Sequence, residues 1–126
     1  DLKSELHPKI EIIKVVRVGN DLKDFAKKMS NLEIVKDEIS FLLFDTDTQF
    51  YGGSGQTFDW QLLDILKINS PYILSGGLSL DNHQLIKAIK QTPAILDINS
   101  KFEISPGKKD LDKIKDFISK IKNDGF

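Results

Sequence analysis

Cysteine is absent from the 126 residues, and histidine, tryptophan and methionine are rare, with two, one and one copies. The lack of cysteine excludes disulfides and thiolate metal ligands, and it agrees with the cytoplasmic location that we expect. His7 and His83 lie far apart without a partner at ligand spacing, so we expect no metal site. The start of the sequence, "DLKSELHPKI", is polar and charged, so we expect no cleavable leader.

The sequence also lacks an excess of charge of one sign and a long apolar run. Its formal net charge is -1 and its lysines form no stripe, so we expect neither nucleic acid nor an anionic membrane surface as a partner. No apolar run approaches the roughly 20 residues that span a bilayer. With 40% hydrophobic and 29% charged residues, we expect residues 1–126 to form one globular unit with a substantial core.

Four short apolar runs predict four β-strands. They are "IEIIKVVRV", "ISFLLFDT", "PYILSGG" and "AILDIN", which begin near residues 10, 39, 71 and 94. Helical periodicity lies between and after them, in "DLKDFAKKM", "FDWQLLDILKI", "LSLDNHQLIKAIKQT" and "DLDKIKDFISKIKND". Strands that alternate with helices imply a parallel sheet with helices packed on it, so we predict an α/β protein of about four βα units.

Two architectures can use four such units. A closed (βα)8 barrel needs about 250 residues, so this chain would hold about half of one. The alternative is an open, doubly wound sheet, which ordinarily has about five or six strands. Periodicity does not choose between them, but in both architectures functional groups collect at the carboxyl ends of the strands.

Small and polar residues follow three of the predicted strands, where parallel strands would bring them to one rim. They are Asp45 after the second strand, Ser75, Gly76 and Gly77 after the third, and Asp97, Asn99 and Ser100 after the fourth.

Asp45 ends a run of four apolar residues. A carboxyl group there is partly removed from water, which favours its neutral form and suits it to general acid work. The alternative is that Asp45 caps a turn through Thr46 or a backbone N–H group. Lys14 and Arg17 on the first run could serve a site or could pack, and Trp60 is expected to be a core anchor.

The glycines after the third strand, Gly76 and Gly77, directly precede a predicted helix. Glycine lets backbone N–H groups approach an anion, although a tight βα turn would have the same composition. Asn99 and Ser100 offer further donors at the next strand end. Phosphate sites in barrels are often built by the loops after the last two strands, so this pair of turns predicts a phosphate site.

A further glycine-rich segment, "YGGSGQTFDW", follows Asp45. It lacks the Gly-Lys-Ser/Thr of a Walker A loop and the third glycine of a dinucleotide fingerprint. Its length, from Thr48 to Thr57, suits a mobile cover better than a tight turn.

Taken together, "FLLFDT…YGGSGQTFDW", "PYILSGGL" and "LDINSKFEISPGKKD" resemble the phosphoribosylanthranilate isomerases of tryptophan biosynthesis, from about Glu11 to Lys122. The resemblance implies a (βα)8 barrel in which these four runs are strands five to eight, so that the chain is a C-terminal half-barrel. It also implies an Amadori rearrangement of a sugar phosphate, N-(5-phosphoribosyl)anthranilate, by general acid and base catalysis without cofactor or metal.

The resemblance assigns roles to individual residues. Asp45 would be the general acid that protonates the ribose ring oxygen, and Asp97 would lie in the site. Gly53 and Gly55 would belong to the loop that closes beside the substrate. The turns that hold the phosphate would contain Ser75, Gly76, Gly77, Asn99 and Ser100.

The chain departs from the family pattern in three ways. Lys101 follows Ser100 where many relatives have glycine, and Gln56 replaces a common lysine. The family's general base is a cysteine on the first strand, and this chain has no cysteine. We therefore expect the chain alone to be inactive: a half-barrel that binds phosphate and either joins a missing N-terminal half or self-associates through an open strand edge. A related barrel enzyme acting on another sugar phosphate is the remaining alternative.

Overall fold

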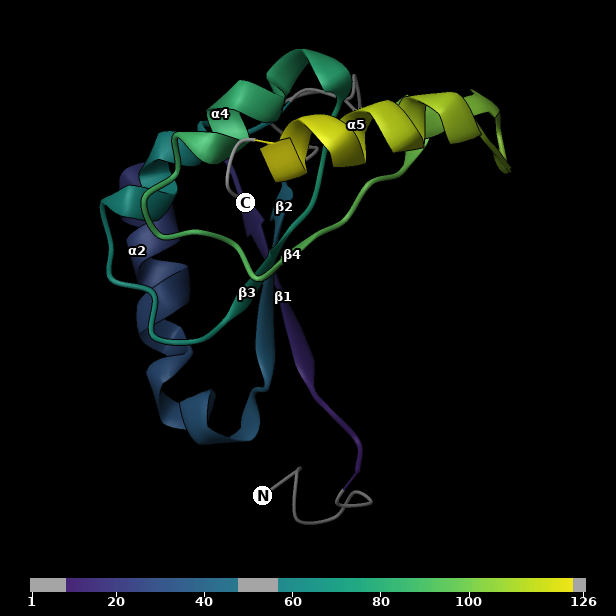
Figure 1. Ribbon diagram of the computed structural model, residues 1–126. Helices are drawn as coiled ribbons and strands as arrows, with labels where there is room; N and C mark the ends of the chain where they lie inside the picture. Colours follow the sequence, from purple (N-terminus) through teal and green to yellow (C-terminus); the bar gives the residue numbers. More distant parts are fainter. Residues whose placement is uncertain (1–8, 48–56, 124–126) are drawn as a thin grey trace.

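The structure, a computed structural model, describes residues 9–47 and 57–123 (Figure 1). The described residues form a parallel sheet with the strand order β1-β2-β3-β4. Each strand lies within one of the four predicted apolar runs, so the prediction of an α/β protein with a parallel sheet is confirmed. The strands are β1 (Ile13–Val18), β2 (Phe41–Thr46), β3 (Tyr72–Leu74) and β4 (Ile95–Leu96).

Helices and 3-10 turns connect the strands, and a two-stranded hairpin follows β4. The predicted C-terminal helix is α5, and Asp110, which directly precedes it, accepts a hydrogen bond from the backbone N–H of Lys113 at 3.2 Å, as an N-cap residue does. The elements are α2 (Leu22–Asn31), η1 (Glu33–Glu38), η2 (Trp60–Asp64), η3 (Leu80–Asn82), α4 (His83–Lys87), η4 (Ser100–Phe102), β5 (Glu103–Ser105), β6 (Lys108–Lys109) and α5 (Leu111–Asn123).

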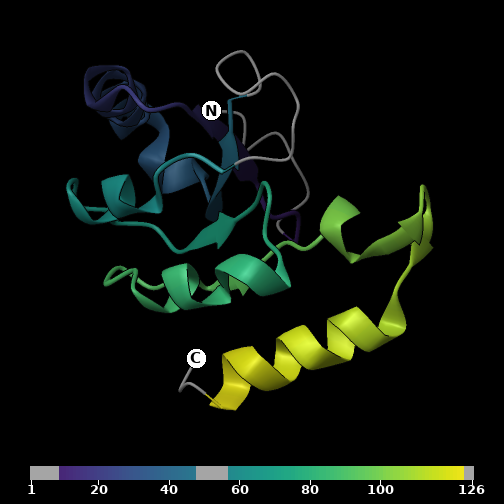
Figure 2. The same cartoon turned by 90° about the horizontal axis from the view of Figure 1, so that it is seen from above.

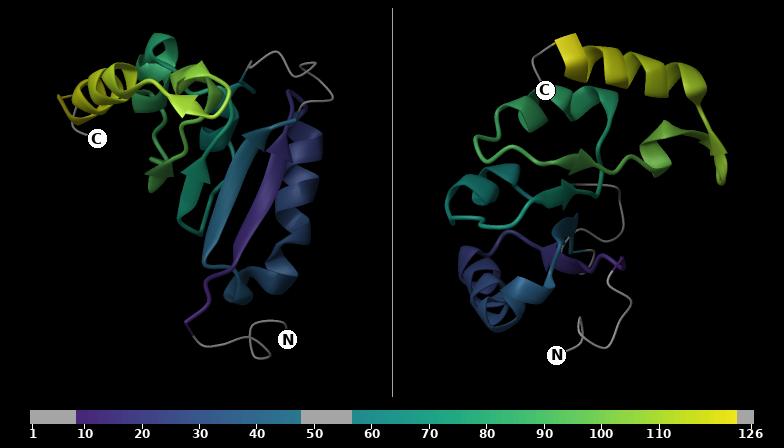
Figure 3. Two further views of the ribbon diagram at one scale, coloured as in Figure 1. Left: turned by 90° about the vertical axis from the view of Figure 1, so that its right-hand side faces the viewer. Right: turned by 60° about the horizontal axis from the view of Figure 1, so that its bottom comes forward.

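One face of the sheet packs against the helices. Figures 2 and 3 show α2, α4 and α5 following one another around one side of the sheet. Phe44 of β2 is fully buried on this face, and its ring meets the edges of Phe25 and Tyr72 with centroid distances of 5.6 and 5.2 Å. The predicted core anchor Trp60 is also buried, with 4% of its surface exposed.

The opposite face of the sheet is apolar but much less covered. Because side chains alternate along a strand, the residues that do not face the helices share this second face. Ile13, Val15 and Ile95 on the two edge strands are 49, 43 and 45% exposed. We call this surface the open face; it comprises Ile13, Val15, Phe41, Leu43, Ile73 and Ile95.

Two of the predicted helices are shorter than the sequence pattern indicates. In "FDWQLLDILKI" only the 3-10 turn η2 forms, because the Gln91 side chain bonds the carbonyls of Leu63 and Leu66 and the N–H of Ile68. These backbone groups are then not available for the backbone hydrogen bonds of a longer helix. The segment that precedes Gln91 likewise yields only η3 and the five residues of α4.

The hairpin of β5 and β6 is an element that the periodicity does not predict. Its turn contains Pro106 and Gly107, with Gly107 at φ +82°, which is the composition of a tight turn. The N–H of Gly107 donates to the Glu103 carboxylate at 2.7 Å. Within the part of the chain described here, no helix has the length and apolar character needed to cross a membrane.

Candidate active site

The carboxyl ends of β2, β3 and β4 meet at a cavity of about 160 Å³. All the predicted site residues that the structure describes line this cavity together with Leu78 and Lys101. They are Asp45, Ser75, Gly76, Gly77, Asp97, Asn99 and Ser100. Gly53 and Gly55 lie outside the described residues.

The register of the sheet explains why these side chains converge. Arg17 of β1 is paired with Asp45 of β2, so both side chains project from the same face. One strand further, the Ser75 hydroxyl donates to the Asp97 carboxylate at 2.9 Å. The polar residues therefore continue the apolar open face at its carboxyl end, in the order in which the strands lie.

Asp45 is held by two donors. Its Oδ1 accepts the backbone N–H of Thr46 at 2.8 Å, and its Oδ2 lies 3.5 Å from Nη1 of Arg17. The side chain is 30% exposed, so it is partly removed from water as the sequence indicates. The contact with the neighbouring N–H is the turn contact considered as the alternative, and it leaves Oδ2 facing a cation.

Of the two cationic candidates on the first strand, only Arg17 reaches this cluster. Lys14 is paired with Leu42, whose side chain is buried on the helix-covered side of the sheet, so Lys14 does not share a face with Asp45. Lys14 lines a hollow beside β1 together with Lys28 and Asp47, and Arg17 borders this hollow as well.

Gly76 packs directly on the Asp45 carboxylate. A Cβ atom at Gly76 would collide with Oδ1 of Asp45 and lie 2.9 Å from the backbone nitrogen of Thr46. Its φ of +88° and the +77° of Gly77 lie in the left-handed region. The double glycine thus brings the β3 turn against the end of β2, which a larger residue would prevent.

The turn after β3 is fixed from the helix side. Asn82 donates from Nδ2 to the carbonyl of Gly77 at 2.8 Å, and its Oδ1 accepts the N–H of Ser79 at 2.9 Å. Ser79 completes a capping box, so it is the N-cap of η3.

Two lysines, Lys101 and Lys109, bring positive charge to the cavity. Neither of them is assigned a role from the sequence. Lys109 of β6 donates to Oδ1 of Asn99 at 3.0 Å and lies 3.9 Å from the Glu103 carboxylate. Lys101 lines the cavity itself. The sequence feature that points to Lys109 is the "PGKKD" turn, which returns this residue toward Asn99.

Thr46, the last residue of β2, anchors the return of the chain after the glycine-rich segment. It is 5% exposed, and its Oγ1 accepts the N–H of Phe58 at 3.2 Å. The sequence predicts Thr46 only as a turn partner of Asp45. In the structure its hydroxyl also links the end of β2 to the residues that precede η2.

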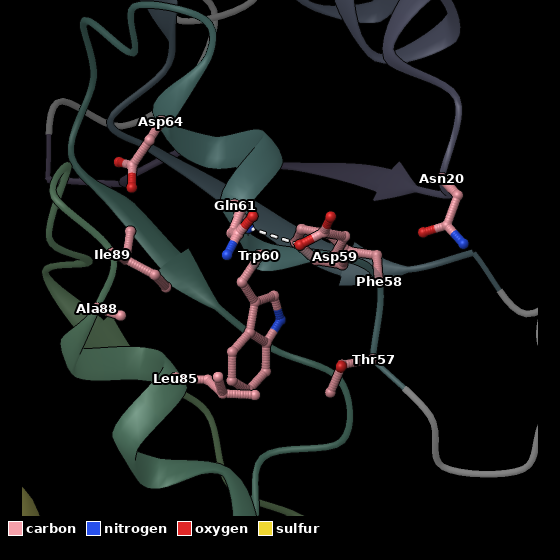
Figure 4. Close-up of a pocket in the computed structure, with 10 residues that line it drawn as sticks. All are labelled: Asn20, Thr57, Phe58, Asp59, Trp60, Gln61, Asp64, Leu85, Ala88 and Ile89. Carbon is pink, nitrogen blue, oxygen red and sulfur yellow. Dashed lines mark hydrogen bonds between the residues drawn. The ribbon is translucent and has the colours of Figure 1, made fainter.

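A second, larger cavity of about 340 Å³ lies between the start of η2 and α4 (Figure 4). It contains none of the predicted site residues, and its walls include Trp60, Leu85 and Ile89. The Trp60 N–H is buried and has no hydrogen-bond partner among the described residues. Across the ranges that the structure describes, no three His, Cys, Asp or Glu side chains gather as a metal ion would require.

Comparison with known proteins adds a family to this geometry. Residues 1–120 match the family model described as N-(5'phosphoribosyl)anthranilate (PRA) isomerase. The N-(5'-phosphoribosyl)anthranilate isomerase of Parabacteroides distasonis is 45% identical over 84 residues, which cover 66% of this chain and 38% of that protein. The protein of the same name from Petrotoga mobilis is 41% identical over 117 residues, covering 90% and 52%.

A third relative is the tryptophan biosynthesis protein TrpCF of Helicobacter pylori, which is 45% identical over 114 residues, covering 90% of this chain and 23% of that protein. The chain therefore spans about half or less of the length of these curated relatives. No solved structure matches the chain.

Proposed function

The chain belongs to the N-(5'-phosphoribosyl)anthranilate isomerase family, and on this basis we propose that it carries the acid and the phosphate site of such an isomerase. The observation that carries the proposal is the single cavity that unites Asp45 with the glycine turn after β3 and with Asn99 and Ser100. These groups occupy the carboxyl ends of neighbouring parallel strands, where α/β enzymes place their chemistry.

We also propose that residues 1–126 form the C-terminal half of a (βα)8 barrel, with β1 to β4 as its last four strands. The open face supports this, because the inner side of a barrel sheet must be buried by side chains from the other strands. The share of the relatives' length that the chain spans, about half in the Petrotoga mobilis protein, agrees with it. The cytoplasmic location expected from the sequence stays a prediction.

The reaction would use the site as follows. Asp45 gives its proton to the ribose ring oxygen while the bond from that oxygen to C1 breaks, which leaves a protonated imine. A base then removes the C2 proton, and the resulting enolamine tautomerises to the aminoketose. Arg17, 3.5 Å from Oδ2, is placed to stabilise the carboxylate that remains on Asp45 after the first step.

The phosphate of the substrate would sit in the turns after β3 and β4. The left-handed backbone at Gly76 and Gly77 brings the chain close to a ligand without side chains in the way. Asn99 and Ser100 add amide and hydroxyl groups from the neighbouring strand end. Neutral donors of this kind position the anion, while Asp97 tethers Ser75 at the rim.

The base is the part that this chain does not supply under the proposal, because the family resemblance implies a cysteine and the chain has none. We therefore expect no turnover from the chain alone. Turnover should appear when the chain is co-expressed with the part of the Petrotoga mobilis relative that lies outside the alignment. Consumption of phosphoribosylanthranilate can be followed by the fluorescence change of the anthranilate ring.

Asp45→Asn tests the acid in that reconstituted enzyme. Loss of a general acid should lower kcat by about 100-fold or more. Asp37→Asn on η1 removes an exposed acid outside the cavity and should leave kcat unchanged. Full activity of the Asp45→Asn enzyme would exclude Asp45 as the acid, and turnover by the chain alone would show that the base lies within it.

An alternative is favoured by the exposed apolar side chains of the open face. The chain could act as a catalytically silent, phosphate-binding half-barrel that associates with a second copy through this face and through the outer edge of β1, with which no described strand pairs. This alternative has the same phosphate site and differs only in what covers the sheet. It is therefore tested by measuring the oligomeric state of the chain.

A further inference from the structure

The cavity at the strand ends is lined by two carboxylates, which is an unfavourable setting for a phosphate. Asp45 has Arg17 as a partner, and among the described residues the Asp97 carboxylate accepts a hydrogen bond only from the neutral Ser75 hydroxyl. A phosphate monoester carries close to two negative charges at neutral pH. Backbone N–H groups and the neutral side chains of the turns orient such an anion but supply no net positive charge to offset Asp97.

Lys101 is the cation that the cavity lining offers. It follows Ser100 in η4 and is exposed. Within the described part of the chain, its side chain takes part in no ion pair and no hydrogen bond. The neighbouring Lys109 differs, because Asn99 and Glu103 already bind its ammonium group.

We propose that the Lys101 ammonium group is the counter-charge that holds the substrate phosphate in this cavity. This inference rests on the proposed function and adds a residue to it. The cavity of about 160 Å³ is smaller than the roughly 300–1,000 Å³ of pockets that enclose whole ligands. It therefore suits one end group of a ligand, and the free lysine at its rim selects an anionic one.

The chemistry of lysine sets the character of this contact. An ammonium group on a flexible stem acts as a mobile point charge, unlike the rigid fork of arginine. Lys101 can thus follow the phosphate as it enters and offset the nearby Asp97 carboxylate. Because the group is exposed, the contact is screened by salt, so the affinity for phosphate should fall as ionic strength rises.

The test is a titration of the chain with ribose 5-phosphate, followed by amide NMR signals of Gly76, Gly77 and Ser100 at two salt concentrations. Lys101→Gln should weaken binding by about tenfold, the scale of one hydrogen bond to a charged group, and should flatten the salt dependence. Lys101→Arg keeps the charge and should restore most of the affinity. Lys115→Gln on α5 removes the same charge outside the cavity and should bind like the unmodified chain.

The outcomes separate this inference from the proposed function. Equal affinity of the Lys101→Gln and unmodified chains, with shifts at the glycine turn, overturns the inference and leaves the phosphate site in place. Equal weakening by Lys101→Gln and Lys115→Gln also overturns it, because only overall charge would then matter. A chain that binds ribose as well as ribose 5-phosphate, or binds neither, removes the phosphate site and the inference together.

Discussion

At the scale of single residues, the site depends on how closely Gly76 approaches Asp45. The Asp45 carboxylate and the Thr46 backbone fill the space where a side chain at position 76 would begin. Asp45 is therefore oriented by three contacts: the Thr46 N–H, the Arg17 guanidinium and the backbone of the β3 turn. A carboxyl group restrained in this way loses little freedom when a substrate arrives, which favours its use as an acid.

Gly76→Ala should disrupt this arrangement, and Gly107→Ala provides a matched control. Both glycines have positive φ, but a Cβ atom at Gly107 would meet nothing within 4 Å. Gly107→Ala should therefore cost only the left-handed backbone penalty of about 1–2 kcal/mol. Gly76→Ala should cost more and should also displace Asp45, so urea unfolding of both variants measures the difference.

A loss of stability for Gly76→Ala no larger than that for Gly107→Ala would show that Asp45 and the turn can move apart freely. In the reconstituted enzyme, Gly76→Ala should also lower kcat, whereas Gly107→Ala, outside the cavity lining, should not.

At the scale of elements, the Gln91 side chain connects the segments that precede β3 and β4, at the end of the sheet opposite the site. This side chain bonds one carbonyl of η2 and one carbonyl and one N–H of the segment after it, all more than 20 residues earlier in the chain. In the opposite direction, the Asp64 carboxylate accepts hydrogen bonds from the backbone N–H groups of Lys90 and Gln91 at 2.9 and 2.8 Å. The connection before β3 is thus held to the connection before β4 by polar contacts rather than by helix length.

Gln91→Ala should remove three of these hydrogen bonds and leave their backbone partners without acceptors or donors. With a penalty of about 1 kcal/mol or more for each half-buried group, the expected loss of unfolding free energy is about 2–4 kcal/mol. Gln84→Ala, at an exposed position on α4, should change stability by less than about 0.5 kcal/mol. Similar thermal unfolding of the two variants would contradict the role given to Gln91.

Tyr72 on β3 makes the stability of this region depend on pH. Its hydroxyl donates to the Gln91 carbonyl, and burial together with the negative charge of Asp64 raises its pKa above the ordinary value. A raised pKa in the folded state stabilises the fold fully below about pH 10, the pKa of tyrosine in the unfolded chain. This stability is lost progressively as pH rises above 10.

The unfolding free energy should accordingly fall between about pH 10 and 11.5 more steeply for the unmodified chain than for Tyr72→Phe, which has no group to ionise at that position. Denaturant titrations at pH 8, 10 and 11 measure the two slopes. Parallel slopes would show that ionisation of Tyr72 does not contribute, since the lysines titrate alike in both proteins.

The four strands could be predicted because their apolar runs are continuous, and the convergence of Asp45, Gly76 and Asn99 could be predicted because parallel strands end on one rim. The length of η2 could not, since the carbonyls of Leu63 and Leu66 bond a glutamine side chain more than 20 residues later in the chain. The contact of Lys109 with Asn99 likewise depends on a hairpin turn. Long-range polar contacts of this kind leave no period in the sequence.

At the scale of the whole molecule, the question is what covers the open face. Its apolar side chains lead directly to the polar rim, so the surface that would line a barrel interior and the site form one continuous face. In isolation, the 43–49% exposure of Ile13, Val15 and Ile95 leaves apolar area in water, and no described strand pairs with the outer edge of β1.

The isolated chain should therefore self-associate, and the association should depend on the open face. Sedimentation velocity at increasing concentration should show a shift from monomer to dimer or larger species. Val15→Lys places a charge on the open face and should return the chain to monomer, because burying an unpaired ammonium group in an apolar contact is costly. Ile34→Lys on η1, at a position 92% exposed, makes a comparable change elsewhere and should leave the association unchanged.

The same pair of variants separates the two proposals for what covers the sheet. If the complementary part of a relative covers the open face, adding it should convert the self-associated chain into a one-to-one complex, and Val15→Lys should weaken that complex as well. A chain that stays monomeric at all concentrations, or that associates equally in both lysine variants, would show that the open face does not drive assembly and that contacts elsewhere must be sought.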